Sequence, residues 1–456
     1  MPPNLVSKDG GNPHVCEIAR TRPAITFLLV LAVLLPPGVA FGILYSQALP
    51  VPYQDDYKAI LAFADEYGQL PTLKAKLLDI ATKQFNEYKI GFEHSIIASE
   101  IELTHHLNFA FLTALGDLML LPIAYLLWRT FEEDESDLNR RLLDFLPISL
   151  LFFSLAYWEN LNWAMTGLQN TPVIFFSFLA IYLLTPAKMS GHPRAHLLLA
   201  CLAAALAACS SANGFLLAPV GLLILLLSRA YGCSLTWCAS FAVPLAAYLY
   251  HYHRLAEPMY RAFYITRPLS FLAFFGAVIP FRWPAALLGM MILTIVAFAV
   301  YSRFDRTNPA VFYFAVWIVA TGSLVAWVRG AAGFGVVSRY SIYSNLALIC
   351  CYTFLTQYLS TRWSSFNRGC FYVASVVIAV GICVRTDVSA YGKLGARRRM
   401  VLSGIEFYRA RPETNSPMVD PVAERALPGE RETELYILTR AIQQHIYTLP
   451  PKQETR

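Results

Sequence analysis

The chain has 456 residues, of which 56% are hydrophobic and only 14% are charged, and its formal net charge is +6. Soluble domains carry about 25% charged residues, so this composition excludes an ordinary soluble enzyme and indicates a membrane protein. The basic residues are scattered along the chain, which argues against a nucleic-acid-binding surface because such a surface needs a clustered basic face.

The N-terminal part predicts a cytoplasmic leader followed by a membrane span. Residues 1–23 are mostly polar and include Lys8, Arg20 and Arg22. The apolar run at 24–45 is longer than the roughly 7–15 residues of a signal-peptide core, and no small-x-small cleavage site follows it. We therefore expect it to be retained as the first span.

A long polar segment, 47–106, follows this span and is the outer loop of the predicted topology. Apolar residues recur there at helical spacing in two groups, which predicts two amphipathic helices lying along the membrane surface. The first group is Ile60, Phe63, Ala64 and Tyr67, and the second is Leu73, Leu77 and Ile80.

Ten further apolar stretches are long enough, or nearly so, for a span of about 20 residues. They lie at 107–128, 145–158, 172–184, on either side of 210–214, and at 235–250, 285–301, 311–328, 340–359 and 371–384. The expected fold is an all-α polytopic membrane protein with about eleven transmembrane helices. The stretch 271–281 is too short to cross easily and predicts a half-helix that dips into the bilayer.

Charge bias sets the expected orientation. Lys and Arg gather in the leader and in the short loops on its side, which the positive-inside rule places in the cytoplasm. The outer loop 47–106 and the polar tail 386–456 then lie outside, with 24–385 forming the membrane domain. In a bacterium this is the inner membrane, with the loop and tail in the periplasm. If 271–281 crosses the membrane, the tail becomes cytoplasmic.

Adjacent carboxylates open the outer loop. Asp55 and Asp56 repel each other at a membrane interface, so one can have a raised pKa and act as a general base. The alternative is a solvated turn. Glu87 and Lys89, about thirty residues later in the same loop, could return to this place or lie on an exposed helix face.

Other polar residues interrupt the apolar body. Glu159 lies among aromatic residues at the end of a span, where a carboxylate is costly unless it is partnered or functional. Asp117 lies within a span, as an interhelical brace or a proton relay. Arg329 and Arg339 flank a glycine-rich loop that could hold a phosphate, although it lacks the features of a P-loop.

Metal dependence is left open. Glu100, Glu102, His105 and His106 are of metal-ligating types, but their spacing matches no standard site, so a divalent metal remains an alternative. The nine cysteines include no C-x-x-C pair, and those after Cys16 lie in or beside apolar spans. They predict neither a disulfide framework nor a zinc site.

Several short motifs, in this order along the chain, resemble the GT-C membrane glycosyltransferases, and more narrowly a bacterial branch that uses polyprenyl-phosphate sugars. The motifs are Gln54-Asp55-Asp56-Tyr57, Asn86-Glu87-Tyr88-Lys89-Ile90, Glu159-Asn160 with Trp163 and Gln169, Ser211-Ala212-Asn213-Gly214 and Ser338-Arg339-Tyr340. The branch more often has His-Arg where this chain has Tyr88-Lys89.

The resemblance implies transfer of a hexose or pentose from a polyprenyl-phosphate donor to a hydroxyl of a glycan, lipid or protein at the outer face. Asp55 or Asp56 would be the base, and Glu87 a second carboxylate. Arg339 would stabilise the leaving phosphate. The remaining expected substrate-binding residues are Gln54, Asn86, Lys89, Glu159, Asn160, Gln169, Asn213, Arg282 and Arg329.

Two other function classes stay open on the sequence. A transporter or flippase for a lipid-linked or anionic solute would use Asp117 and Glu159 as coupling groups, but would leave the acidic outer loop unexplained. A polysaccharide polymerase would also take a polyprenyl-linked donor.

Overall fold

The computed structural model describes residues 23–131, 137–253, 268–279, 281–329, 338–360, 362–410 and 428–451. In this part of the chain, eight helical segments are long and apolar enough to cross a membrane: Pro23–Gln47, Phe109–Arg129, Ala164–Leu184, Pro193–Ser210, Tyr231–Leu249, Trp283–Tyr301, Pro309–Ala326 and Phe366–Ala410. The predicted all-α polytopic fold is confirmed at this level. The higher count of eleven stays a prediction.

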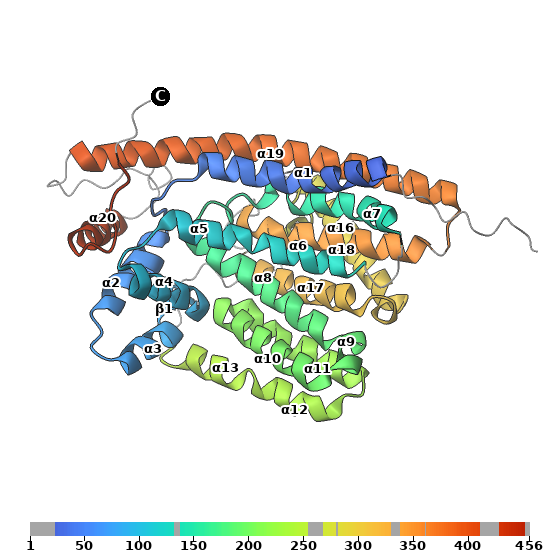
Figure 1. Cartoon of the computed structure of the whole chain (residues 1–456), viewed down its shortest axis with the longest axis horizontal. Helices are drawn as coiled ribbons and strands as arrows, with labels where there is room; N and C mark the ends of the chain where they lie inside the picture. Colours follow the sequence, from blue (N-terminus) through green and yellow to red (C-terminus); the bar gives the residue numbers. More distant parts are fainter. Residues whose placement is uncertain are drawn as a thin grey trace, which may run out of the picture.

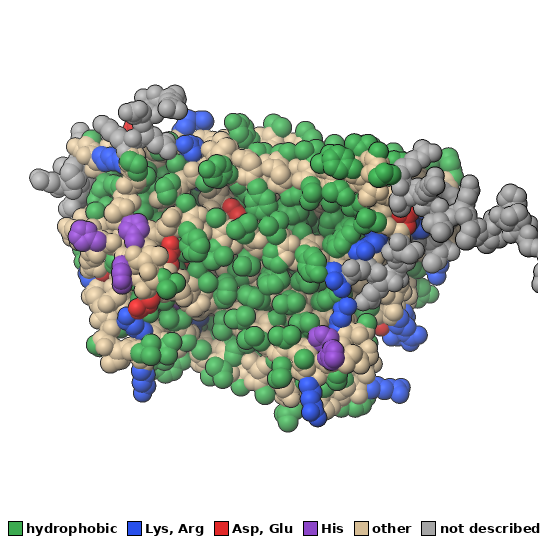
Figure 2. All heavy atoms as spheres, in the orientation of Figure 1, with side chains coloured by type: hydrophobic (Ala, Val, Ile, Leu, Met, Phe, Trp, Pro, Cys, Tyr) green, Lys and Arg blue, Asp and Glu red, His purple; other side chains and the backbone are tan. Residues whose placement is uncertain are grey.

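The spanning segments form one elongated bundle (Figure 1). It contains α1 (Pro23–Gln47), α5 (Phe109–Leu118), α6 (Leu120–Arg129), α8 (Ala164–Leu184), α10 (Pro193–Ser210), α12 (Tyr231–Ala239), α13 (Ala242–Leu249), α16 (Arg282–Tyr301), α17 (Pro309–Arg329) and α19 (Ser365–Ala410). Hydrophobic side chains cover the middle of the face in Figure 2, and most charged and histidine side chains lie toward its two ends. This pattern suits a bilayer crossed along the long axis.

Shorter helices complete the bundle. They are α7 (Leu138–Phe152), η2 (Leu155–Tyr157), α9 (Pro186–Gly191), η3 (Ala212–Leu216), α11 (Leu217–Leu227), α15 (Pro268–Phe275), η5 (Phe304–Arg306), η7 (Ser338–Tyr340) and α18 (Ser341–Ser360). Helix α15 has eight residues and would rise only about 12 Å, too little to cross about 30 Å of hydrocarbon. It packs closely on α16, because a Cβ on Gly289 would lie 1.8 Å from the carbonyl oxygen of Leu272.

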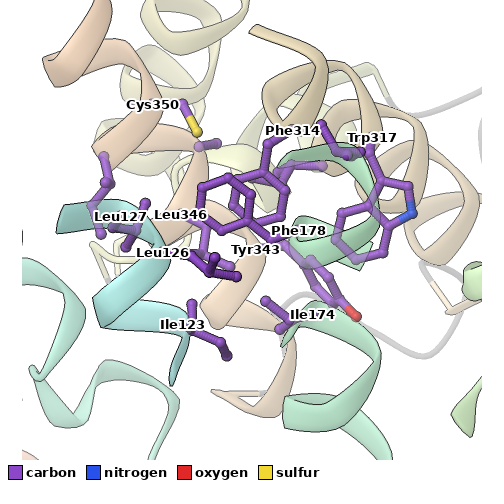
Figure 3. Close-up of a cluster of buried hydrophobic side chains, with 14 of the residues drawn as sticks. Ile123, Leu126, Leu127, Ile174, Phe178, Phe314, Trp317, Tyr343, Leu346 and Cys350 are labelled. Atoms are coloured by element: carbon purple, nitrogen blue, oxygen red, sulfur yellow. The ribbon is translucent and has the colours of Figure 1, made fainter. Parts of the chain in front are cut away.

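The centre of the bundle is a continuous apolar core to which α6, α8, α17 and α18 contribute (Figure 3). Phe178 of α8 stacks on Phe314 of α17, with ring centres 4.1 Å apart. Trp317 and Tyr343 are also almost completely buried there. These large side chains leave little freedom in how the helices pack, so the ends of the helices are held in fixed relative positions.

The outer loop folds into a small unit at one end of the bundle (Figure 1). It contains η1 (Tyr57–Ala62, a π-helical turn), α2 (Phe63–Gly68), α3 (Leu73–Thr82), β1 (Gln84–Phe85), β2 (Tyr88–Lys89) and α4 (Gly91–Thr104). The strands form an antiparallel hairpin in which Gln84 pairs with Lys89. Asn86 turns the hairpin with φ 49, a left-handed conformation that asparagine tolerates well.

The two predicted amphipathic helices differ in their surroundings. In α3, Leu73, Leu77 and Leu78 are exposed, as a membrane-surface helix requires. The first predicted helix became η1 and α2, whose apolar residues, Ile60 and Phe63 among them, are buried in a second core. Its apolar face is covered by protein because the C-terminal helix α20 (Pro428–Gln443) packs against it.

The tail returns to the outer loop. Helix α19 continues past the apolar stretch that ends at Val384 and reaches Ala410, and α20 then packs against η1 at the same end of the bundle (Figure 1). Arg440 forms a 2.6 Å ion pair with Asp65, and the Tyr447 hydroxyl donates to the carbonyl of Pro50 at 3.0 Å. The outer loop and the described part of the tail therefore lie on the same side of any membrane.

Candidate active site

The acidic pair lies in a tight turn between α1 and η1. Gln54 has φ 47, an uncommon backbone conformation for a side chain of this kind, and such strain clusters at functional sites. The Asp56 N–H donates to the Tyr53 carbonyl at 3.0 Å, and the Ala59 N–H donates to the Asp55 carbonyl at 2.8 Å. These bonds fix the two adjacent carboxyl groups in different environments.

Asp56 is the inward-facing member of the pair, with only 1% of its surface exposed. Its carboxylate accepts hydrogen bonds from the Tyr53 N–H at 2.9 Å, the Met165 N–H at 2.9 Å and the Trp163 indole at 3.1 Å. Burial raises the pKa of Asp56 to about 7, although the two backbone hydrogen bonds oppose the shift. Asp56 thereby joins the outer loop to the start of α8.

Asp55 is the more accessible of the two carboxyl groups, since it is half-buried whereas Asp56 is almost fully enclosed. A general base must reach the proton that it removes. Within this turn, that requirement is met better by Asp55, and the three hydrogen bonds of Asp56 suit a positioning role.

Arg397 of α19 brings a buried positive charge to this turn, and the sequence did not indicate it. Its guanidinium lies 4.4 Å from the ring centre of Tyr53, 5.0 Å from that of Trp158 and 5.9 Å from that of Trp163. It donates to the carbonyl of Asn162 at 2.9 Å. Its charge interacts with Asp56 and with Asp117 of α5.

Glu159, Asn160 and Arg339 form a brace beside these rings. The Arg339 N–H donates to the Glu159 carboxylate at 3.2 Å, and the Asn160 amide donates to the Arg339 carbonyl at 2.5 Å. The Arg339 guanidinium lies 5.8 Å from the ring centre of Trp163. The structure thus brings together three residues, from two distant motifs, that the sequence marked separately.

Glu93 is a further carboxyl group near the acidic pair that the sequence analysis passed over. It is fully buried in α4, and neither of its side-chain oxygens has a hydrogen-bond partner among the described residues. Burial raises its pKa well above the ordinary value, and the charges of Asp56 and Asp55 add to this effect. Burial therefore disfavours the ionised form of Glu93.

A cavity of about 440 Å³ adjoins this cluster. Its walls are mostly apolar and come from α15, the start of α16, η2 and the middle of α19. Its polar lining comes from Trp158, Arg385 and Lys393 and from the hydroxyl side chains of Ser338, Ser341, Thr386 and Ser389. The Lys393 ammonium lies 5.7 Å from the ring centre of Trp158, and Arg397 contacts the same ring. Trp158 therefore lines the cavity and contacts Arg397, which in turn contacts Tyr53 of the acidic turn.

The hairpin residues bond to a different segment. Lys89 is buried, and its ammonium donates to the carbonyls of Ala247, at 3.1 Å, and Tyr250. The Tyr248 hydroxyl donates to the Glu87 carbonyl at 3.0 Å. Lys89 caps the C-terminal end of α13, as a cation there should, so its bonds are explained without a ligand.

The other predicted residues are spread more widely. Asn213 of η3 donates to the Tyr343 hydroxyl at 2.9 Å, and Gln169 is buried within α8. Arg282 begins α16 and Arg329 ends α17, but both side chains lie outside the described part of the structure. Among the described residues, no group of three or more His, Cys, Asp and Glu side chains is arranged to hold a metal ion.

Comparison with known proteins adds no assignment, since no protein-family model, curated protein sequence or solved structure matches the chain. The functional argument therefore depends on the site itself.

Proposed function

We propose that the chain is a membrane glycosyltransferase that moves a sugar from a polyprenyl-phosphate donor to an acceptor hydroxyl at the outer face of the membrane. The observation that carries this proposal is the link, through Trp158 and Arg397, between a cavity with apolar walls and cationic edges and a turn with paired carboxylates. The cavity suits an anionic lipid, and the paired carboxylates suit removal of a proton from a hydroxyl.

The donor would occupy the cavity. Its isoprenoid chain is apolar, as are the walls formed by residues such as Leu155, Val278 and Ile279. Its phosphate is anionic and would lie near Arg385 and Lys393, whose charges would stabilise the negative charge that develops on the phosphate as it leaves the sugar. A lipid-phosphate leaving group needs no protonation by the protein, which fits an edge that carries cations.

The acceptor hydroxyl would meet Asp55. Its proton passes to the Asp55 carboxylate as its oxygen attacks the anomeric carbon, and the bond from that carbon to the phosphate oxygen breaks with its electron pair. Asp56, tied to Tyr53, Trp163 and Met165, would hold the turn in place. Its burial makes it a positioning residue rather than the base.

Asp117 is the residue on which a transporter would depend. Only 7% of its surface is exposed. It lies where α5 and α8 approach closely, since a Cβ on Gly116 would be 2.8 Å from the Gly167 backbone. It accepts a backbone hydrogen bond from Asn162, whose carbonyl in turn binds Arg397. These bonds favour a brace over a moving proton carrier.

The test is sugar transfer in membranes that carry each variant at matched expression, supplied with a polyprenyl-phosphate-linked hexose or pentose. Asp55→Asn should lower kcat by at least about 100-fold, since base catalysis contributes about 10²–10⁴-fold. Lys393→Gln should raise the KM for the donor. Asp137→Asn is the matched control, because Asp137 caps α7 through the Asn139 N–H and asparagine caps equally well.

Full activity in Asp55→Asn would overturn the proposed base. Solute uptake that fails in Asp117→Asn while Asp55→Asn is tolerated would establish the transporter instead.

A further inference from the structure

Asp387 of α19 is a carboxylate in an apolar part of the chain. Helix α19 runs along one side of the bundle (Figure 1), and the segment Phe366–Ala410 is apolar enough to cross a membrane. On the same helix, Val384 is 58% exposed and Val388 is 71% exposed, as expected for side chains that face lipid. An acid in such a segment is costly unless it is partnered or functional. The partner of Asp387 therefore indicates its role.

That partner is the start of η2. The Leu155 N–H donates to Oδ1 of Asp387 at 2.8 Å, whereas the Cys383 thiol approaches the other carboxylate oxygen only at 3.5 Å. The start of a helix leaves backbone N–H groups without a partner in the helix. Ser154, which precedes η2, is of a type that commonly caps, but its hydroxyl donates to the Leu151 carbonyl and makes no cap. Asp387 supplies the cap from another helix.

This hydrogen bond joins two walls of the proposed donor cavity. Leu155 and Ala156 of η2 line the cavity on one side, and both sequence neighbours of Asp387 line it on another. The Ala156 carbonyl accepts a hydrogen bond from the Ser341 hydroxyl of α18 at 2.8 Å, and Ser341 also lines the cavity. The short helix η2 is thus held by α19 through an N–H and by α18 through a carbonyl.

The segment held in this way leads directly into two residues of the candidate site. Helix η2 ends at Tyr157, and Trp158 and Glu159 follow. Trp158 lines the cavity and contacts Arg397, and Glu159 accepts a hydrogen bond from the Arg339 N–H. A shift of η2 would therefore displace the cavity wall and the brace together.

We infer that Asp387 is a positioning residue for the lipid-phosphate donor, because it caps η2 and so fixes the cavity wall formed by η2 against α19. This role rests on the proposed function, since the cavity must hold the donor. Asp387 itself does not line the cavity and acts through Leu155 and the adjoining Trp158. The acidic turn is tied to α8 through Asp56, so loss of Asp387 should affect donor binding more than proton removal by Asp55.

The first test measures binding of polyprenyl phosphate without a sugar to the purified full chain in detergent. Asp387→Leu removes the acceptor and should weaken binding about 10-fold, near the lower end of what a hydrogen bond to a charged group contributes. Asp387→Asn should bind within about 3-fold of the wild type, because its side-chain oxygen can still accept from the Leu155 N–H. Ser375→Leu is the matched control, since Ser375 donates to the Phe371 carbonyl of its own helix and lies outside the cavity lining.

Leu155→Pro keeps the test valid if Asp387→Leu fails to accumulate. Proline lacks an N–H and is tolerated in the first turn of a helix. The extended backbone of Ser154, with ψ 143, suits the residue before a proline. Because this variant removes the same hydrogen bond from the other side, the double variant with Asp387→Leu should bind no more weakly than the weaker single variant.

Sugar transfer gives a second readout. Asp387→Leu should raise the KM for the donor about 10-fold while kcat stays within about 2-fold, as for a lost interaction that is equal in the ground and transition states. A wild type that binds no polyprenyl phosphate would overturn the proposed donor site. Wild-type binding with unchanged affinity in Asp387→Leu, equal losses in Asp387→Asn and Asp387→Leu, or additive losses in the double variant would each overturn the positioning role alone.

Discussion

The Arg397 guanidinium lies 4.4 Å from the ring centre of Tyr53, although the two residues come from opposite ends of the chain. Tyr53 belongs to the acidic turn, and its N–H holds Asp56. Because α19 runs beyond the apolar stretch, its last turns reach the outer unit and place a buried cation against this turn. The last membrane helix thus forms part of the candidate site.

The acidic turn should make stability depend on pH. Burial raises the pKa of Asp56 from 3.8 to about 7, so the folded chain holds this proton more tightly than the unfolded chain. The stabilising contribution is complete below the ordinary pKa and is lost as the pH rises through about 7. With about three pKa units at 1.36 kcal/mol each, it is worth about 4 kcal/mol.

Asp56→Asn should remove this dependence. We expect the Tm in detergent to fall less between about pH 5 and pH 8 in the variant than in the wild type. Glu93 and Glu100, whose pKa values are also raised by burial, remain in both proteins. Because the charge of Asp56 also raises the pKa of Glu93, the difference between the two proteins reports Asp56 together with its effect on Glu93. Parallel Tm curves would show that Asp56 is ionised throughout this range.

Lys89 should act on α13 rather than on a ligand. Lys89→Met removes the donor to the Ala247 and Tyr250 carbonyls, so amide hydrogen exchange should accelerate across 248–253 while the donor KM stays unchanged. Lys83→Met is the control, because Lys83 pairs with Glu66 at the surface. A raised KM for the donor with unchanged amide exchange would show instead that Lys89 binds the substrate.

The tail should share the side of the outer loop. Gln69 and Gln443 are exposed in the two segments that pack together, so cysteines at both positions should react with an impermeant reagent in intact cells. A cysteine at Arg362, at the other end of the bundle, should be protected. Labelling at position 69 with protection at position 443 would contradict the packing of α20 on η1.

The features that the sequence predicted are those that depend on a few neighbouring residues. Apolar runs revealed the spans, and the spacing of Asp55 and Asp56 after the first span marked the turn. The brace of Glu159, Asn160 and Arg339 was also marked, although its contacts were not predictable. Each of these signals is contained in a few neighbouring residues.

What the sequence could not predict depends on how distant segments pack. Arg397 follows the last apolar stretch in a basic run and reads as a tail residue, because only the uninterrupted course of α19 brings it to Tyr53. Asp65 reads as part of an exposed polar face but is 8% exposed and paired with Arg440. Glu93 was passed over because its burial depends on the fold of the whole outer unit.

Arg397 should lower the pKa of Asp56 through its charge, as well as pack against the acidic turn. Burial is the main cause of the raised pKa of Asp56, and the charge of Arg397 opposes it. Arg397→Gln removes that charge, so the pKa of Asp56 should rise further. If ionised Asp56 is needed to hold the turn, the acid limb of the pH–rate profile for sugar transfer should move to higher pH.

Arg397→Lys separates charge from packing. Lysine retains the charge but cannot stack its head group on Tyr53, Trp158 and Trp163 as a planar guanidinium does. Because cation–π contacts are worth about 0.5–2 kcal/mol, we expect the free energy of unfolding to fall by about 2 kcal/mol while the pH–rate profile keeps its position. Arg399→Gln, on an exposed part of the same helix, should change neither. An unmoved profile in Arg397→Gln would reduce Arg397 to a packing residue.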